Sequence, residues 1–127
     1  MKHQIDSVKK FHEVYKLSYK NSPSVDLDRD KLQLRHSLMS EENDEYLEAA
    51  KNNDLIEVAD ALGDMLYILC GTIIEHGMQN KIEEVFDEIQ KSNMSKLGSD
   101  GKPIYREDGK VLKGPNYFKP NILKILS

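Results

Sequence analysis

The chain has 127 residues, of which 39% are hydrophobic and 31% are charged, and its net charge is -4. This length predicts a single domain, residues 1–127, with a modest core. The acidic balance argues against nucleic acid as a partner, because nucleic-acid-binding surfaces are basic. The single cysteine excludes an internal disulfide and favours a reducing, cytoplasmic setting. No signal peptide and no membrane partner are expected, since the chain starts without an apolar core and polar residues interrupt its longest apolar stretch.

Apolar residues recur at three- and four-residue spacing in four segments, which predicts four helices. The helices are expected from about Gln4 to Tyr19, from Asp28–Lys31 to Lys51, from Leu55 to His76, and from Lys81 to Leu97. Asn80 with Glu83 is typical of a capping box at the start of the fourth helix. Gly77 and Gly98 are expected to end the third and fourth helices.

Beyond the fourth helix the composition changes to turn residues and short apolar segments. Segments 104–106 and 110–113 flank Glu107-Asp108-Gly109, which predicts a β-hairpin within a tail of residues 99–127. The expected fold is therefore all-α, a four-helix bundle with a short C-terminal β-hairpin. One subunit of this size offers a limited core, so we expect oligomerisation to complete the bundle, as a homodimer first and a homotetramer second.

Two helices are expected to turn an apolar face toward the core. On the third helix that face consists of Ala59, Leu62, Leu66, Leu69 and Ile73. On the fourth helix it consists of Ile82, Val85, Phe86, Ile89 and Met94. Cys70 lies in an apolar run of the third helix, and we interpret it as a buried packing residue, since free cysteine behaves as a small hydrophobe.

The second helix carries acids where apolar residues would be expected. Its main stripe begins with Leu34 and Leu38, becomes acidic at Glu42 and Glu45, and returns to Ala49. An ordinary surface helix places its charges on the face opposite the apolar stripe. This departure favours a site that faces inward.

The acids form two pairs with the same spacing, Glu42 with Glu45 and Glu57 with Asp60. Residues three apart share a helix face, so two packed helices would aim four carboxylates at one point. Like charges at that separation repel strongly, and the arrangement is stable only if cations fill the gap. Oxygen ligands suit a hard divalent ion such as Mg²⁺ or Mn²⁺, and such ions commonly handle phosphates.

A structural interpretation of the same acids stands beside this one. Acidic clusters are usually solvated helix faces, and Asp54 with Glu57 is itself a plausible capping box. Asp60 has no such role, because it lies among apolar residues where an unpartnered charge would be costly. Asp64, one turn later, would likewise be a costly unpartnered charge if it were buried. The paired acids on consecutive helices together favour the metal site.

The order Glu41-Glu42-x-x-Glu45, a short link and Glu57-x-x-Asp60 resembles the signature of the all-α nucleoside triphosphate pyrophosphohydrolases. That superfamily includes MazG-like proteins and phosphoribosyl-ATP pyrophosphohydrolases. Residues 61–67, 91–96 and 100–115 are also similar to MazG-like members, and the resemblance spans roughly residues 32–118. The link between the two motifs is short for the family, which predicts a compact turn. The resemblance implies a MazG-like bundle.

The resemblance also implies a set of metal ligands: Glu42, Glu45, Glu57 and Asp60. It implies Mg²⁺-dependent hydrolysis between the α- and β-phosphates of a nucleoside triphosphate, NTP or dNTP, giving a nucleoside monophosphate and pyrophosphate. Glu41 is the catalytic candidate, since it could orient or deprotonate the attacking water. Glu41 could instead hold an extra ion or remain a solvated helix residue.

Six further residues are candidates for binding the substrate: Asn93, Lys96, Tyr67, Asp64, Arg106 and Lys110. The resemblance favours Asn93 and Lys96 as phosphate or sugar contacts, although a cation near a helix C-terminus is favourable by itself. Tyr67 could reach the substrate or pack in the core, and Asp64 could support the ligands or add to them. Arg106 and Lys110 could close over a substrate, in the same or a neighbouring subunit, or remain exposed charges.

Two rival functions stay open at this level. One is a related pyrophosphohydrolase with a special substrate, such as phosphoribosyl-ATP or a nucleotide alarmone. The other is a non-catalytic helical interaction module whose acids bind a structural cation or face water. Base and sugar preference and the number of ions stay open as well.

Overall fold

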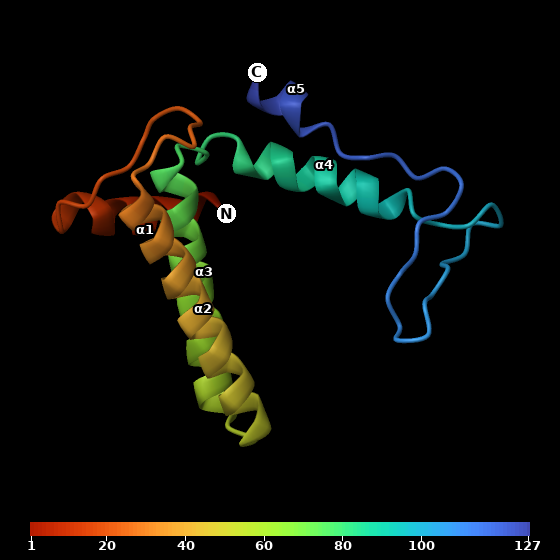
Figure 1. Ribbon diagram of the computed structural model, residues 1–127, viewed down its shortest axis with the longest axis horizontal. Coiled ribbons are helices and arrows are strands. Elements are labelled where there is room, and N and C mark those ends of the chain that lie inside the picture. Colours follow the sequence, from red (N-terminus) through yellow and green to blue (C-terminus); the bar gives the residue numbers. More distant parts are fainter. The chain divides into compact units, whose positions relative to one another are not determined.

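The computed structural model describes all residues from 1 to 127, and it is built from helices without a sheet (Figure 1). The helices are α1 (Lys2–Val14), α2 (Arg29–Lys51), α3 (Leu55–Glu75), α4 (Ile82–Met94) and α5 (Ile122–Leu126). The chain divides into two units, Met1–Asn80 and Lys81–Ser127. The expected all-α class is confirmed. No helix has both the length and the apolar character needed to cross a bilayer.

Side-chain caps start the two long helices of the first unit. The Asp28 carboxylate accepts a hydrogen bond from the backbone N–H of Lys31 at 2.8 Å, at the start of α2. The Asp54 carboxylate accepts one from the backbone N–H of Glu57 at 3.1 Å, at the start of α3. Between the helices, Asn53 adopts a left-handed backbone with φ 53°. The link is therefore a tight turn, and α2 and α3 form an antiparallel pair (Figure 1).

The first helix is shorter than its apolar spacing predicts. It ends at Val14 rather than near Tyr19, because Lys16 turns the backbone left-handed at φ 58° and Leu17 N–H donates to the His12 carbonyl at 2.8 Å. The loop that follows is held against the end of α3, where Lys20 N–H donates to the Ile74 carbonyl at 3.0 Å. The apolar residues of this loop therefore repeat with helical spacing by coincidence.

Gly77 ends α3 as expected, and it does so for a steric reason as well as a conformational one. Its φ is +69°, and the N–H of Met78 donates to the Ile73 carbonyl at 2.9 Å, the pattern of a glycine C-cap. A Cβ at this position would lie 2.0 Å from the Ser22 carbonyl oxygen. Glycine is thus required for the α1–α2 loop to approach the helix end.

The core of the first unit lies where α1 and α2 pack on α3. Its buried apolar residues are Ile5, Val8, Ala49, Ala61, Cys70, Ile73 and Ile74. The expected burial of Cys70 is confirmed. The expected core face of α3 is confirmed only at Ile73, which is buried, whereas Leu62, for example, is 49% exposed. Because α3 is apolar around most of its circumference, periodicity alone did not identify the face that α1 and α2 cover.

In the second unit, α4 differs from expectation at both ends. Its N-cap is Lys81 and no side chain caps it, so the Asn80–Glu83 box does not form. It ends at Met94, before Leu97, and Gly98 does not cap it. Its expected inner face is also open, since Phe86 is 67% exposed.

The tail returns along α4 and ends in a short helix that the sequence did not predict. The buried Ser92 hydroxyl donates to the Phe118 carbonyl at 2.8 Å, and Phe118 N–H donates to the Ser95 hydroxyl at 3.1 Å. The Asn121 side chain caps α5 by accepting from Lys124 N–H at 3.2 Å. The bonds of Phe118 with Ser92 and Ser95 hold the tail on the end of α4.

The expected β-hairpin is reduced to a single antiparallel bridge between Tyr105 and Val111. Two backbone bonds support the bridge, from Arg106 N–H to the Lys110 carbonyl at 2.7 Å and from Leu112 N–H to the Ile104 carbonyl at 2.8 Å. The turn chemistry of the sequence is therefore present, but strands do not extend from it. An isolated two-stranded element with no third strand is only marginally stable in water.

Candidate active site

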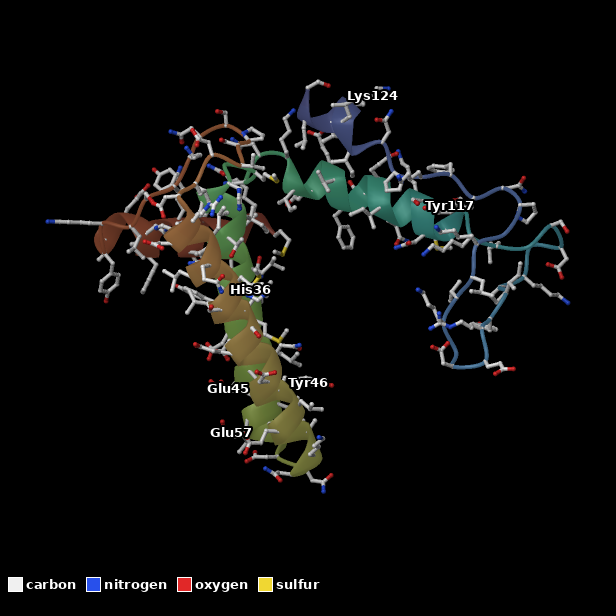
Figure 2. The ribbon with its side chains drawn as sticks, viewed as in Figure 1. His36, Glu45, Tyr46, Glu57, Tyr117 and Lys124 are labelled. Atoms are coloured by element: carbon white, nitrogen blue, oxygen red, sulfur yellow. The ribbon has the colours of Figure 1, made fainter.

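The acidic motifs lie on neighbouring stretches of α2 and α3, toward the turn that joins the two helices. In Figure 2, Glu45 of α2 and Glu57 of α3 lie on the same edge of the helix pair. The tight turn at residues 52–54 reverses the chain, so residues that follow one another on α2 meet residues in the opposite order on α3. The two motifs are thereby brought to one region of the pair.

A hollow of about 450 Å³ opens at this end of the pair. Five of the side chains that line it are acidic: Glu45, Glu48, Asp54, Glu57 and Asp60. The remaining lining residues are Ala49 and Asn52, so no basic side chain lines the hollow. Carboxylates without a cationic partner repel one another, and the hollow is therefore an attractive place for a cation.

Glu42 lies beside this hollow and is the most perturbed acid of the chain. Its side chain is half-buried, and its Oε2 atom is buried without a hydrogen-bond partner. Burial is the main cause that raises the pKa of Glu42 to about 7, and the adjacent Glu45 carboxyl and the charges of Asp64 and Asp60 add to it. Glu45, Asp60 and Asp64 are thus close enough to act on Glu42 electrostatically.

The acids of this region do not converge on a single point. No group of three or more His, Cys, Asp or Glu side chains is close enough to hold one metal ion. Residues of this type nevertheless fit a hard divalent cation, because the donors are all oxygens and the buried Oε2 of Glu42 lacks a partner. A cation would supply the attraction that brings such carboxylates together.

The other candidates from α2 and α3 differ in their surroundings. Glu41 is exposed on α2. Asp64 is exposed as well, and it acts on Glu42 through its charge. Tyr67 packs edge-on against Phe11 of α1, with ring centroids 5.7 Å apart and an angle of 90° between the rings.

The remaining four candidates belong to the second unit, residues 81–127. Asn93 is exposed near the end of α4, and Lys96 is half-buried just beyond it. Arg106 forms a two-pronged ion pair with Asp108 within its own turn, and its Nε lies 2.8 Å from the Asp108 Oδ1. This pairing lowers the pKa of Asp108 and raises the pKa of Arg106. Lys110 is exposed in the same turn.

Two features of this helix pair escaped the sequence analysis. Glu48 lines the acidic hollow, and its place three residues after Glu45 is a signal that could have identified it. The second feature is a buried charge cluster at the opposite end, where Arg35 is 9% exposed and Glu75 is 2% exposed. Arg35 lies three and seven residues before Leu38 and Glu42, which places it on the inward stripe of α2.

Two comparisons with known proteins found a match. The model of the phosphoribosyl-ATP pyrophosphohydrolase family matches residues 8–93. A solved structure from Exiguobacterium sp. 255-15, described as a candidate NTP pyrophosphohydrolase, is similar with a TM-score of 0.50 and 25% sequence identity, over 94% of this chain and 90% of that chain. A comparison with curated proteins found no match.

Proposed function

Because the chain belongs to the phosphoribosyl-ATP pyrophosphohydrolase family, within the MazG-like superfamily, we propose that it hydrolyses a nucleoside triphosphate to the monophosphate and pyrophosphate. The family and its structural neighbour support a hydrolase that acts on phosphoric anhydrides. The proposed cofactor is Mg²⁺, with Mn²⁺ as a substitute. The proposed ligands are Glu42, Glu45, Glu57 and Asp60, and Glu41 is the proposed catalytic residue.

The observation that carries this proposal is the uncompensated acidity of the hollow beside Glu42. Five acids line the hollow, no basic residue does, and the buried Glu42 Oε2 has no hydrogen-bond partner. A solvated acidic face would leave its oxygens in water and would need no explanation. Here one oxygen is removed from water without compensation, which is costly unless the carboxyl binds a proton or a ligand supplies a positive charge.

The proposed chemistry assigns distinct roles to these residues. A triphosphate carries about four negative charges at neutral pH, so it cannot approach an acidic hollow without cations. Divalent ions, when bound, neutralise the phosphates and lower the pKa of bound water. The four ligand carboxylates would hold the ions and orient the triphosphate. Glu41, at the edge of this set, would hold the attacking water or accept its proton.

The cationic and polar candidates outside the ligand set are proposed as substrate contacts: Asn93, Lys96, Tyr67, Asp64, Arg106 and Lys110. The basic members offer the charge that phosphate binding needs. Arg106 would have to exchange its Asp108 partner for a phosphate, since both of its prongs are engaged. We also propose that residues 1–127 act as one pyrophosphohydrolase domain, because the family match runs from α1 through most of α4.

We propose further that the active protein is a homodimer, with a homotetramer as the second choice. A row of large apolar side chains on α3 is open to solvent in the single chain, with Ile56 exposed beside it: Leu55, Leu62, Leu66 and Leu69. Exposed apolar rows of this length usually mark an interface. Light scattering of the purified protein tests this proposal, and a monomer at micromolar concentration would contradict it.

Phosphoribosyl-ATP is a second candidate substrate, because the family whose model matches is named for it. The two candidates share the α–β phosphoric anhydride that is cleaved, so the acids do not distinguish them. They differ outside that anhydride, because phosphoribosyl-ATP carries a phosphoribosyl group that a common nucleoside triphosphate lacks. A preference would therefore be decided by residues away from the ions.

The decisive experiment is a turnover screen with Mg²⁺ that measures pyrophosphate release. The panel contains the common NTPs and dNTPs together with phosphoribosyl-ATP, and EDTA provides the control without metal. Release from one class of substrate, abolished by EDTA, is the expected result. An absence of pyrophosphate from every compound would contradict the proposed function and favour a non-catalytic helical module.

A further inference from the structure

The buried cluster opposite the acidic hollow ties α2 to α3 through one guanidinium group. Arg35 Nη2 donates to the Ile68 carbonyl at 2.7 Å, and Arg35 Nε donates to the Thr72 hydroxyl at 3.0 Å. The two acceptors are one turn apart on α3. A planar guanidinium that satisfies both has little freedom to rotate or slide, so it sets the position of α2 along α3.

The surface of α3 is shaped to receive this group. Gly71 lies between the two acceptors, and a Cβ at that position would come within 2.6 Å of Arg35 Nη2. Glu75, one turn beyond Gly71, has its Oε2 4.0 Å from Arg35 Nε and its Oε1 3.2 Å from Lys31 Nζ. Arg35 therefore occupies a notch that is open because Gly71 has no side chain, and the opposite charge of Glu75 lies beside it.

The notch at Gly71 and the acids near the hollow are separated by one to two helix turns on both α2 and α3. Glu42 follows Arg35 by seven residues, which is two turns or about 10 Å along α2. Asp64 and Asp60 precede Ile68 by one and two turns on α3, and they lie on the same side of the notch because the helices are antiparallel. A slip of one residue would move Glu42 by about 1.5 Å and rotate it by about 100°.

We propose that Arg35 is a positioning residue for the reaction, because its clamp on Ile68 and Thr72 sets the helix register in which Glu42 faces Asp60 and Asp64. This inference rests on the proposed function for its catalytic consequence. Its structural part, that Arg35 sets the register, stands on the two hydrogen bonds and the notch at Gly71. Arg35 acts through the position of α2 and needs no contact with the substrate or the ions.

The first test compares the metal dependence of turnover in Arg35→Ala with that of a destabilised control. Ile74→Ala is the control, because Ile74 is a fully buried residue of α3 whose side chain takes no part in the hydrogen bonds of Arg35. Both variants are assayed well below their unfolding temperatures. In Arg35→Ala the Mg²⁺ concentration for half-maximal activity should rise about 10- to 100-fold, the range found when supporting residues of metal ligands are removed.

Ile74→Ala should keep its half-maximal Mg²⁺ concentration within about twofold of the native value, because misplacement of ligands rather than lost stability is what weakens the site. Arg35→Lys keeps the charge near Glu75 but cannot span both acceptors, and an intermediate value is expected. Equal metal dependence in Arg35→Ala and Ile74→Ala would overturn the proposal. If Arg35→Ala does not fold, Thr72→Val and Gly71→Ala each disturb the same clamp from the α3 side.

The second test measures the register itself and needs no activity. Spin labels are attached to cysteines at Ser40 on α2 and Gly63 on α3, both exposed positions, in a Cys70→Ala background diluted with unlabelled protein. The distance distribution should shift or broaden in Arg35→Ala and stay unchanged in Ile74→Ala. An unchanged distribution in Arg35→Ala would refute the register claim, whereas a chain that never releases pyrophosphate but shows the shift would refute only the proposed function.

Discussion

The two ends of the α2–α3 pair differ in whether basic side chains compensate the charges of their acidic residues. At the end away from the turn, the buried Glu75 carboxylate meets Lys31 and Arg35, so the protein itself supplies the cations. Toward the turn, acids line a hollow that contains no basic side chain, and one oxygen of Glu42 is buried without a partner. Charges that the fold compensates hold the helices together, whereas charges that it leaves uncompensated are available to an external cation.

The largest expected effect comes from removing a charge at the uncompensated end. Glu42→Gln or Asp60→Asn should lower turnover by about 10³-fold or more, because each removes a proposed ligand that is needed to hold charge in the transition state. The unfolding free energy of the metal-free protein should not fall, since repulsion among the acids is relieved. Pyrophosphate release and thermal unfolding measure the two effects.

Asp44→Asn is the matched control for that comparison. Asp44 is an exposed acid of α2 that does not line the hollow beside Glu42, so its loss should leave turnover nearly unchanged. Similar losses from Asp44→Asn and Glu42→Gln would indicate that only the overall charge of α2 matters. The distinction between the hollow and the general surface would then be wrong.

The next largest effect is expected at the compensated end. Glu75→Ala leaves Arg35 buried without its opposite charge, and removing one member of a buried pair typically costs about 3–5 kcal/mol of unfolding free energy. Urea unfolding measures this change. Lys31→Ala should cost much less, because the Lys31 side chain is 24% exposed and water can replace part of its interaction with Glu75. A larger loss from Lys31→Ala would reverse this ranking.

Divalent ions should raise the unfolding free energy through the end with the acidic hollow and not through the other end. If Mg²⁺ or Mn²⁺ binds the folded chain at the acidic hollow, as proposed, then at about 100 times its dissociation constant it should add about 2.7 kcal/mol of stability. Thermal unfolding with and without the ion measures this gain. Glu42→Gln should reduce the gain, whereas Glu75→Ala should keep it, and a gain that persists in Glu42→Gln would place the ion elsewhere.

The smallest expected effect is a pH dependence of the metal-free protein. The pKa of Glu42 is raised from 4.5 to about 7 in the folded chain, so the folded state binds its proton more tightly than the unfolded state does. The resulting stability is fully present below about pH 4.5 and is lost as the pH rises through about 7. Unfolding midpoints measured between pH 4.5 and 8 should show this trend, and Glu42→Gln should remove it.

Local sequence signals were enough to predict the α2–α3 pair and the turn that joins the two helices. Apolar spacing indicated the helices, and the short link with Asp54 as a cap of α3 indicated the tight turn, because these signals act within a few residues of the chain. Gly77 was identified for the same reason. The early end of α1, the reduced hairpin and the last helix were missed, because apolar spacing and turn residues do not show where the backbone leaves a helix or whether a third strand supports a hairpin.

The sequence by itself determined the helical class, the acidic motifs and the family to which the chain belongs, because these depend on spacing and local propensity. Only the tertiary structure decided which face of α3 is covered and that Arg35 fits a notch at Gly71. It also decided that one Glu42 oxygen is buried without a partner. The physical reason is that burial and charge compensation depend on which residues contact one another across two helices. The sequence gives the spacing of residues along each helix but not the contacts between helices.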